Sequence, residues 1–96
     1  MISIGIKDVA GTFAENKDAA RNLRVDILTP TLKKGEPVVL DFSGVKGVTQ
    51  SFIHALISEA FREHGEEALN LIRFKDCNES VKQIITIVTE YMQEAE

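Results

Sequence analysis

The spacing of apolar residues along the chain separates strands from helices. Residues 2–6 alternate isoleucine with small residues, and this period of two predicts a half-buried strand. Residues 38–42 are almost continuously apolar and are bounded by turn residues, which predicts a central strand covered on both faces. Residues 69–74 form a third run of β type. The apolar pattern therefore predicts three strands.

In the segments between and after these runs, apolar residues recur at the spacing of a helix. Asn16 is suited to cap a first helix, which we expect to end or kink at Thr29 because the residue before Pro30 is pushed away from helical geometry. Thr49 or Ser51 is suited to cap a second helix, which we expect to end at residue 65. A last helix is predicted to begin after residue 78.

The order of these elements is β-α-β-α-β-α. Strands that alternate with helices predict a small α/β fold with a mostly parallel sheet of three to four strands, three helices and right-handed crossovers. We find no linker or repeat and expect residues 1–96 to form a single domain. The apolar faces predict a core, which we expect to contain Val39, Leu40, Phe42, Phe52, Leu56, Phe61, Ile72, Phe74, Val81, Ile85 and Val88.

Composition narrows the function classes. The chain has 44% hydrophobic and 27% charged residues, with 11 Lys and Arg against 15 Asp and Glu, so its formal charge is -4. An acidic protein has no general attraction to nucleic acid, and no apolar run approaches the roughly 20 residues of a membrane helix. The single cysteine cannot form an internal disulfide, and the amino-terminal residues lack the features of a secretion signal. We therefore expect a cytoplasmic protein that binds neither nucleic acid nor membrane.

Few residues favour catalysis, a metal or a cofactor. Cys77 could act as a nucleophile with His54 or His64 as its base, but no flanking signature supports this. The two histidines are not three or four residues apart, so they do not predict a metal site. The glycines of Gly44–Gly47 are better explained by a turn than by a phosphate cradle, because no Lys-Ser or Lys-Thr leads into a helix. We expect no enzymatic activity, metal or cofactor.

The segment Thr49–Phe52 is a stronger candidate for a binding site than Cys77, the histidines or the glycines. It places Thr49, Gln50 and Ser51 after an apolar strand and at the predicted start of a helix, where free backbone amides favour anions. Helix capping explains one of these side chains and is one interpretation of the whole segment; three polar residues in a row also leave room for recognition of a partner.

A family resemblance rests on the same region. The segment Val38–Val45, with the sequence VVLDFSGV, is followed after a short gap by Gln50-Ser51-Phe52 and an amphipathic helix. This resembles the centre of a STAS domain, and above all a STAS-like family of unknown function with the pattern Leu-Asp-Phe-Ser-Gly-Val followed by Gln-x-Phe. The resemblance covers roughly residues 16 to 90 and implies a regulatory fold related to the anti-sigma factor antagonists.

The resemblance also bears on individual residues. In the antagonists the first serine of Asp-Ser-Ser-Gly is phosphorylated by a partner kinase, and that position is Gln50 here. The aspartate corresponds to Thr49 and the second serine to Ser51, which leaves Ser51 as the candidate phosphorylation site. The resemblance implies a docking surface formed by this segment and the polar face of its helix. The partner-binding residues we expect are Thr49, Gln50, Ser51, His54 and Ser58.

Two hypotheses follow. In the first, the protein is a non-catalytic regulatory module bound by a separate ATPase of the histidine-kinase type or by another regulator. In the second, it is a small ligand or nucleotide sensor, or a small enzyme, that uses the same segment with Asp41 and Cys77 nearby.

Overall fold

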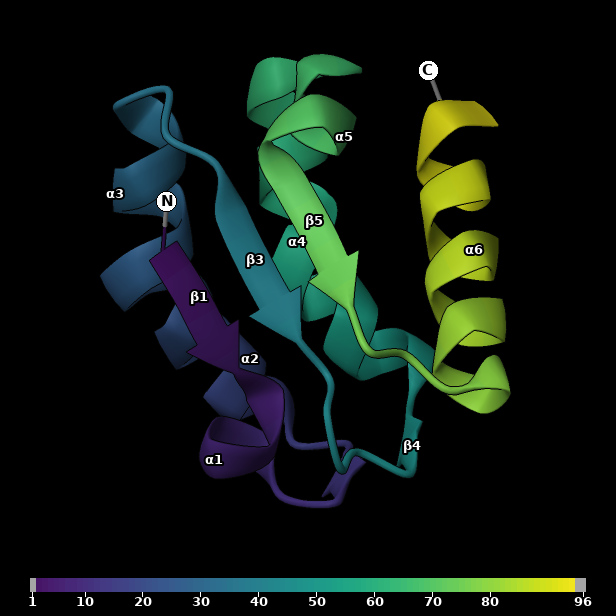
Figure 1. Ribbon diagram of the computed structural model, residues 1–96. Coiled ribbons are helices and arrows are strands. Elements are labelled where there is room, and N and C mark those ends of the chain that lie inside the picture. Colours follow the sequence, from purple (N-terminus) through teal and green to yellow (C-terminus); the bar gives the residue numbers. More distant parts are fainter. Residues whose placement is uncertain (1, 95–96) are drawn as a thin grey trace.

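Three parallel strands form the centre of the computed structural model, which describes residues 2–94. They are β1 (Ile2–Gly5), β3 (Val38–Asp41) and β5 (Ile72–Lys75), and β3 lies between the other two (Figure 1). The predicted alternation of strands and helices and the parallel sheet are thereby confirmed.

The helices cover one face of the sheet, and the face toward the viewer in Figure 1 carries none. On the covered face Leu40 is buried, whereas on the other face Val39 is half-buried and Arg73 is exposed. The expectation that the central strand is covered on both faces is therefore wrong. Both crossovers step in the same direction across the sheet, and right-handed crossovers of that kind place their helices on the same face.

The predicted core is largely confirmed. Val39 and Phe74 are half-buried rather than fully buried, because the first lies on the open face and the second on the edge strand β5. The other predicted members are buried, namely Leu40, Phe42, Phe52, Leu56, Phe61, Ile72, Val81, Ile85 and Val88.

The first crossover is longer than expected. Asn16 caps α2 (Lys17–Leu23), and the chain continues through a π-helix, η1 (Arg24–Leu28), into α3 (Thr29–Lys33). The helix therefore does not end at Thr29, although it departs from α geometry just before that residue. Because Pro30 has no N–H to donate, the wider π register, in which the Thr29 N–H reaches the Arg24 carbonyl, carries the chain through the proline.

Short elements that the periodicity did not reveal lie at the carboxyl end of the sheet. Ile6, predicted to end the first strand, begins the helix α1 (Ile6–Ala10), and β2 (Phe13–Ala14) pairs in parallel with β4 (Gly47–Val48). The ring of Phe13 lies so close to Gly47 that an added Cβ would approach it to 2.9 Å. Because Gly47 has no side chain, it makes room for β2. Gly44 has a positive φ of 78°, which fits the turn expected from the glycines of this segment.

The second crossover and the last helix both begin at predicted caps. The Thr49 side chain accepts a hydrogen bond from the Phe52 N–H and starts α4 (Gln50–His64), which ends at Gly65 as expected. A short helix, α5 (Glu67–Leu71), then precedes β5, so the predicted strand over 69–74 begins too early. Asn78 accepts a hydrogen bond from the Val81 N–H and caps α6 (Glu79–Glu94).

Candidate functional site

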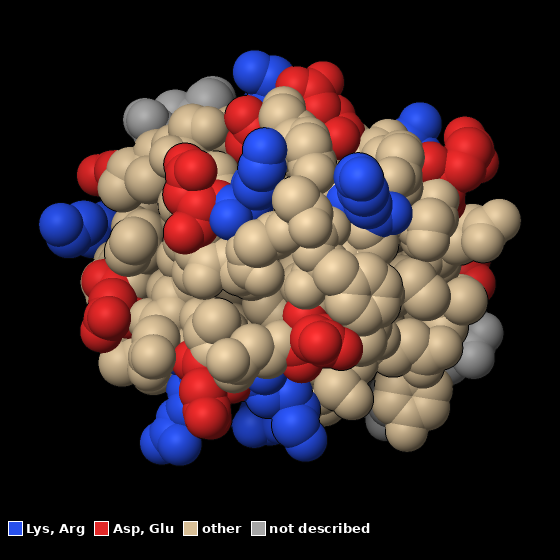
Figure 2. Space-filling view, turned by 90° about the horizontal axis from the view of Figure 1, so that it is seen from below, with Lys and Arg blue, Asp and Glu red and all other residues tan. Residues whose placement is uncertain are grey.

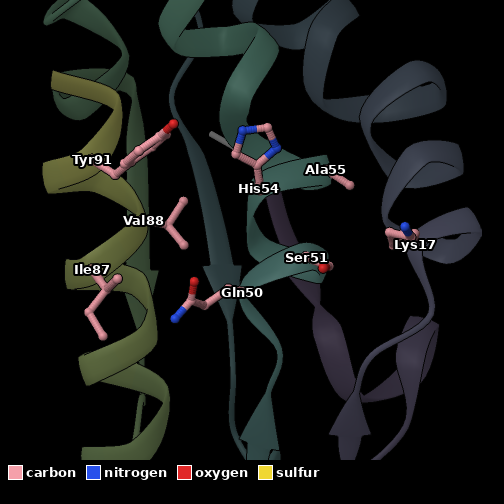
Figure 3. Close-up of a pocket in the computed structure, with 8 residues that line it drawn as sticks. All are labelled: Lys17, Gln50, Ser51, His54, Ala55, Ile87, Val88 and Tyr91. Atoms are coloured by element: carbon pink, nitrogen blue, oxygen red, sulfur yellow. The ribbon is translucent and has the colours of Figure 1, made fainter. Parts of the chain in front are cut away.

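An open groove runs along the amino-terminal half of α4. The helix α4 packs against α2 on one side and α6 on the other, so it forms the floor between two helical walls (Figure 3). The groove has a volume of about 410 Å³. The residues that line it are Lys17 from α2, Gln50, Ser51, His54 and Ala55 from α4, and Ile87, Val88 and Tyr91 from α6.

Three of the five predicted partner-binding residues meet in this groove. Gln50, Ser51 and His54 lie on the exposed side of α4, because the opposite side of the same helix is buried against the sheet. Thr49 directly precedes them and is half-buried, with its hydroxyl oxygen engaged in the helix cap. Ser58 lies one turn beyond His54, is half-buried and does not line the groove.

The polar side chains of the floor are not used by the fold. Within residues 2–94, the side chains of Gln50, Ser51 and His54 make no hydrogen bond or ion pair. Polar groups that stabilise a fold are normally paired with the backbone or with each other. The donors and acceptors of these three residues are therefore available to an incoming group.

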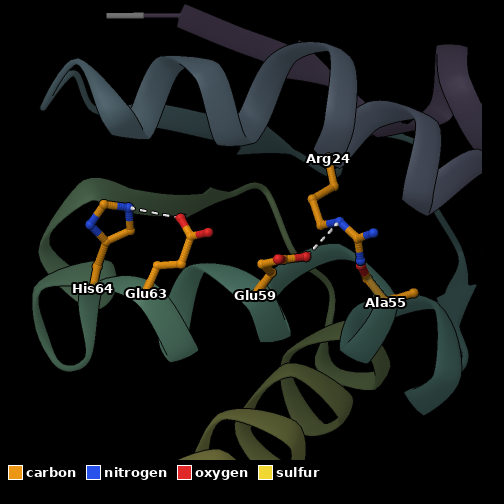
Figure 4. Close-up of polar contacts among 5 residues, drawn as sticks. All are labelled: Arg24, Ala55, Glu59, Glu63 and His64. Atoms are coloured by element: carbon orange, nitrogen blue, oxygen red, sulfur yellow. Dashed lines mark hydrogen bonds and ion pairs between the residues drawn. The ribbon is translucent and has the colours of Figure 1, made fainter.

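A partly buried arginine contact fixes the wall formed by the first crossover. Arg24 donates a hydrogen bond of 2.9 Å to the carbonyl oxygen of Ala55, and its Nε lies 3.5 Å from the Glu59 carboxylate (Figure 4). Ala55 belongs to the groove floor, so this arginine ties η1 to the same turn of α4 that carries His54. His64 lies farther along α4, 4.0 Å from the Glu63 carboxylate.

The walls of the groove were not found from the sequence. Val88 belonged to the predicted core, but Lys17, Ile87 and Tyr91 were not predicted, because a wall forms only where two helices flank a third. The partial signal was the apolar spacing of Ile87 and Tyr91 beside the buried stripe of α6. That spacing alone cannot distinguish the edge of a core from a wall of a groove.

A second polar cluster lies at the carboxyl end of the sheet, on the face viewed in Figure 2. The Asp41 carboxylate accepts hydrogen bonds from the Ser43 N–H at 2.9 Å and the Ser43 hydroxyl at 2.6 Å. The hydroxyl also lies 2.9 Å from the Asp76 carboxylate, and its single proton can be donated to one carboxylate at a time. The bonds from Ser43, with a smaller effect of Lys75, lower the pKa of Asp41, although partial burial opposes them.

The loop beneath this cluster is held by backbone contacts. The Lys46 N–H donates to the Thr12 carbonyl, and the side-chain amide of Asn78 donates to the backbone carbonyls of Val45 and Lys46. Positive and negative side chains are interspersed around this face in Figure 2, and neither sign gathers into one patch. The cluster and its loop thus stabilise the junction between strands and helices.

The structure does not bring Cys77 and the histidines into one site. Cys77 lines a separate hollow with Phe74 and Lys82, whereas His54 lines the groove. Burial raises the pKa of the Cys77 thiol, with a smaller opposing effect of Lys82, and this reduces the fraction of reactive thiolate. Asp41 also lies outside the groove lining.

Two further features bear on the class of site. Within residues 2–94, no three side chains of the His, Cys, Asp or Glu type are placed to hold a metal ion together. The same described range has no helix with both the length and the apolar character that crossing a bilayer requires.

These observations define a small α/β domain in which a helical layer covers one face of a parallel sheet and holds an open groove. A family model described as a STAS-like domain of unknown function matches residues 19–82, more than half of the chain. The chain belongs to this STAS-like family, as the resemblance around Val38–Val45 indicated. No curated protein and no solved structure matches it. The matched range contains the groove floor, whereas Lys17 and the α6 wall lie outside it.

Proposed function

We propose that this protein is a non-catalytic regulatory module whose groove is bound by a separate protein. The observation that carries the proposal is the exposure of Gln50, Ser51 and His54, whose side chains form no hydrogen bond or ion pair within residues 2–94 and line a groove with an apolar wall. Protein interfaces combine buried apolar side chains with polar groups that form hydrogen bonds across the contact, and this groove offers both. Membership in a STAS-like family supports the regulatory role, and the resemblance to anti-sigma factor antagonists favours an ATPase of the histidine-kinase type as the partner.

The position of Ser51 favours control by phosphorylation. Its side chain is exposed in the first turn of α4, where a phosphate would be tolerated by the free backbone amides of the helix start. The same phosphate would lie inside the groove and would have to be desolvated by any partner bound there. Modification of Ser51 would therefore leave the fold intact and release the partner.

The test compares Ser51→Asp with a matched control on another helix. Ser80 is the second residue of α6, as Ser51 is of α4, and it is exposed but lies outside the groove. We expect Ser51→Asp to abolish calorimetric binding to the ATPase or regulator captured from native cells, and Ser80→Asp to retain it. Melting curves control for folding.

A milder variant sharpens the same test. Gln50→Ala should weaken binding by about 1 to 3 kcal/mol, the usual cost of leaving a buried hydrogen-bonding group without its partner. Wild-type affinity in both Ser51→Asp and Gln50→Ala would place the interface elsewhere on the molecule.

We also propose that the chain has no catalytic activity. The support is the separation of Cys77 from His54 and the raised pKa of its thiol. Cys77→Ser should then retain every activity of the wild type in cells. Loss of activity with an unchanged melting temperature would favour the enzyme hypothesis.

A further inference from the structure

The helix α6 carries an apolar pair that the core does not use. Ile87 and Tyr91 are separated by one helical turn and retain 47% and 64% exposure, whereas Val88 between them is 4% exposed and packs inward. Both exposed side chains form the same wall of the groove (Figure 3). Neighbouring apolar side chains left exposed beside polar ones are a feature of binding surfaces.

The opposite wall carries a single positive charge. Lys17 is the only charged residue that lines the groove, and it makes no ion pair within residues 2–94. It is also the first residue of α2, where the helix dipole disfavours a cation. A carboxylate brought by another molecule would complement this charge.

The shape of the groove fits a helix. Its floor is one helix and its walls are two others, so the hollow runs between three helical surfaces (Figure 3). Of the eight lining residues only Val88 is buried and Ala55 half-buried, so the hollow is too open to enclose a small molecule. An amphipathic helix laid along such a groove presents anchors spaced by one turn, as Ile87 and Tyr91 are.

We propose that the groove docks one amphipathic helix of the partner, with apolar side chains on Ile87 and Tyr91 and a carboxylate toward Lys17. The inference rests on the proposed function and specifies its docking element. It adds Lys17, Ile87 and Tyr91 to the interface, and all three lie outside the part of the chain that the family model matches.

Site-specific photo-crosslinking tests this even while the partner is unidentified. The photoreactive residue p-benzoylphenylalanine is introduced into the full chain at position 91, and at position 69 on α5 as a control, since Leu69 is 39% exposed and outside the groove. We expect position 91, and not position 69, to cross-link to a helical segment that contains Asp or Glu. A cross-link to a strand or loop, to a second copy of this chain, or no cross-link at position 91 would overturn the proposal.

Binding measurements with the captured partner separate the two proposals. Ile87→Ala and Tyr91→Ala should each weaken binding at least about tenfold, as truncation of an anchor residue does, and Leu69→Ala should leave it unchanged. All three side chains are exposed, and unchanged melting curves would show that the fold is kept. If Ser51→Asp abolishes binding while Ile87→Ala and Tyr91→Ala do not, the docking helix is refuted and the proposed function stands. Wild-type affinity in every variant refutes both.

Exchanging the two charges tests whether a carboxylate of the partner pairs with Lys17. Lys17→Glu should weaken binding at least about tenfold, and replacing the cross-linked helix's acidic residue with lysine should restore it. Loss of binding without recovery in the doubly exchanged pair would overturn the pairing with Lys17.

Discussion

The two faces of α4 have different roles, one in the core and one in the groove. Toward the sheet, Phe52 and Leu56 are fully buried, and their packing holds the helical layer in place. Toward the groove, Gln50, Ser51 and His54 are exposed and make no hydrogen bond within the described residues 2–94. The residues of the buried face are therefore required for stability, whereas the residues of the exposed face can be chosen for binding a partner.

Polar residues at helix starts and turns divide in the same way. Thr49, Asn78 and Ser43 direct their side chains to backbone groups or carboxylates of the fold, whereas Gln50 and Ser51 do not. In the sequence all five look alike, as polar residues close to helix starts and turns. Hydrogen bonding, rather than residue type, separates the residues that build the junction from those that remain available.

The largest effect should come from the buried face of α4. Leu56 is fully buried, so Leu56→Ala should lower the free energy of unfolding by about 2 to 5 kcal/mol through lost burial and a cavity. Denaturant unfolding measures this change. A near-zero effect would contradict the division of α4 into two faces.

A smaller effect is expected where a polar side chain serves the fold. Asn78 caps α6 and also donates to the carbonyls of Val45 and Lys46, so Asn78→Ala should cost roughly 1 to 2 kcal/mol or more. Asn16→Ala is the matched control, because Asn16 caps α2 without reaching another segment. Equal losses in the two variants would show that the contacts to the loop contribute nothing.

Low pH should weaken the stabilising effect of the cluster formed by Asp41, Ser43 and Asp76. The folded pKa of Asp41 is lowered from 3.8, mainly by the Ser43 hydroxyl, so the stability it contributes is present above that value and is lost as the pH falls through the folded pKa. Ser43→Ala should therefore melt below the wild type at neutral pH, and the difference should shrink in acid. Melting temperatures measured from pH 7 to about pH 2 check this. A difference independent of pH would mean that Ser43 acts by other contacts.

The smallest effect on stability is expected at the groove floor. Ser51→Ala and Gln50→Ala should change the free energy of unfolding by no more than about 0.5 kcal/mol, because both side chains are exposed and unpaired within residues 2–94. Denaturant midpoints measure this, with Thr49→Ala as the neighbouring variant that should cost about 1 kcal/mol. A larger loss at Ser51 would assign it to the fold.

Local signals predicted the parts of the fold that local chemistry determines. The caps at Asn16, Thr49 and Asn78 were recognisable because each side chain bonds to an amide two or three residues later. The continuation of the helix through Pro30 was harder to predict, because a π-helix before the proline accommodates its missing N–H. The short β2–β4 pair has too few residues for a period to show.

The candidate site could be predicted only in part for a related reason. Its floor lies on one segment with a recognisable pattern, and Gln50, Ser51 and His54 were found from it. Its walls at Lys17 and Tyr91 come from the two ends of the chain, and only the packing of three helices brings them beside the floor. The open face of the sheet depended likewise on the direction of the crossovers.

The parallel sheet also governs the order in which this chain can fold. Ile2 pairs with Val38 and Val38 with Ile72, so every ladder contact closes a loop that spans an entire crossover. Helices can form from neighbouring residues within microseconds, whereas such distant pairing must first overcome loop-closure entropy. During synthesis, β1 therefore has no strand to pair with until β3 has left the ribosome, and β5 completes the sheet only after the whole second crossover has been made.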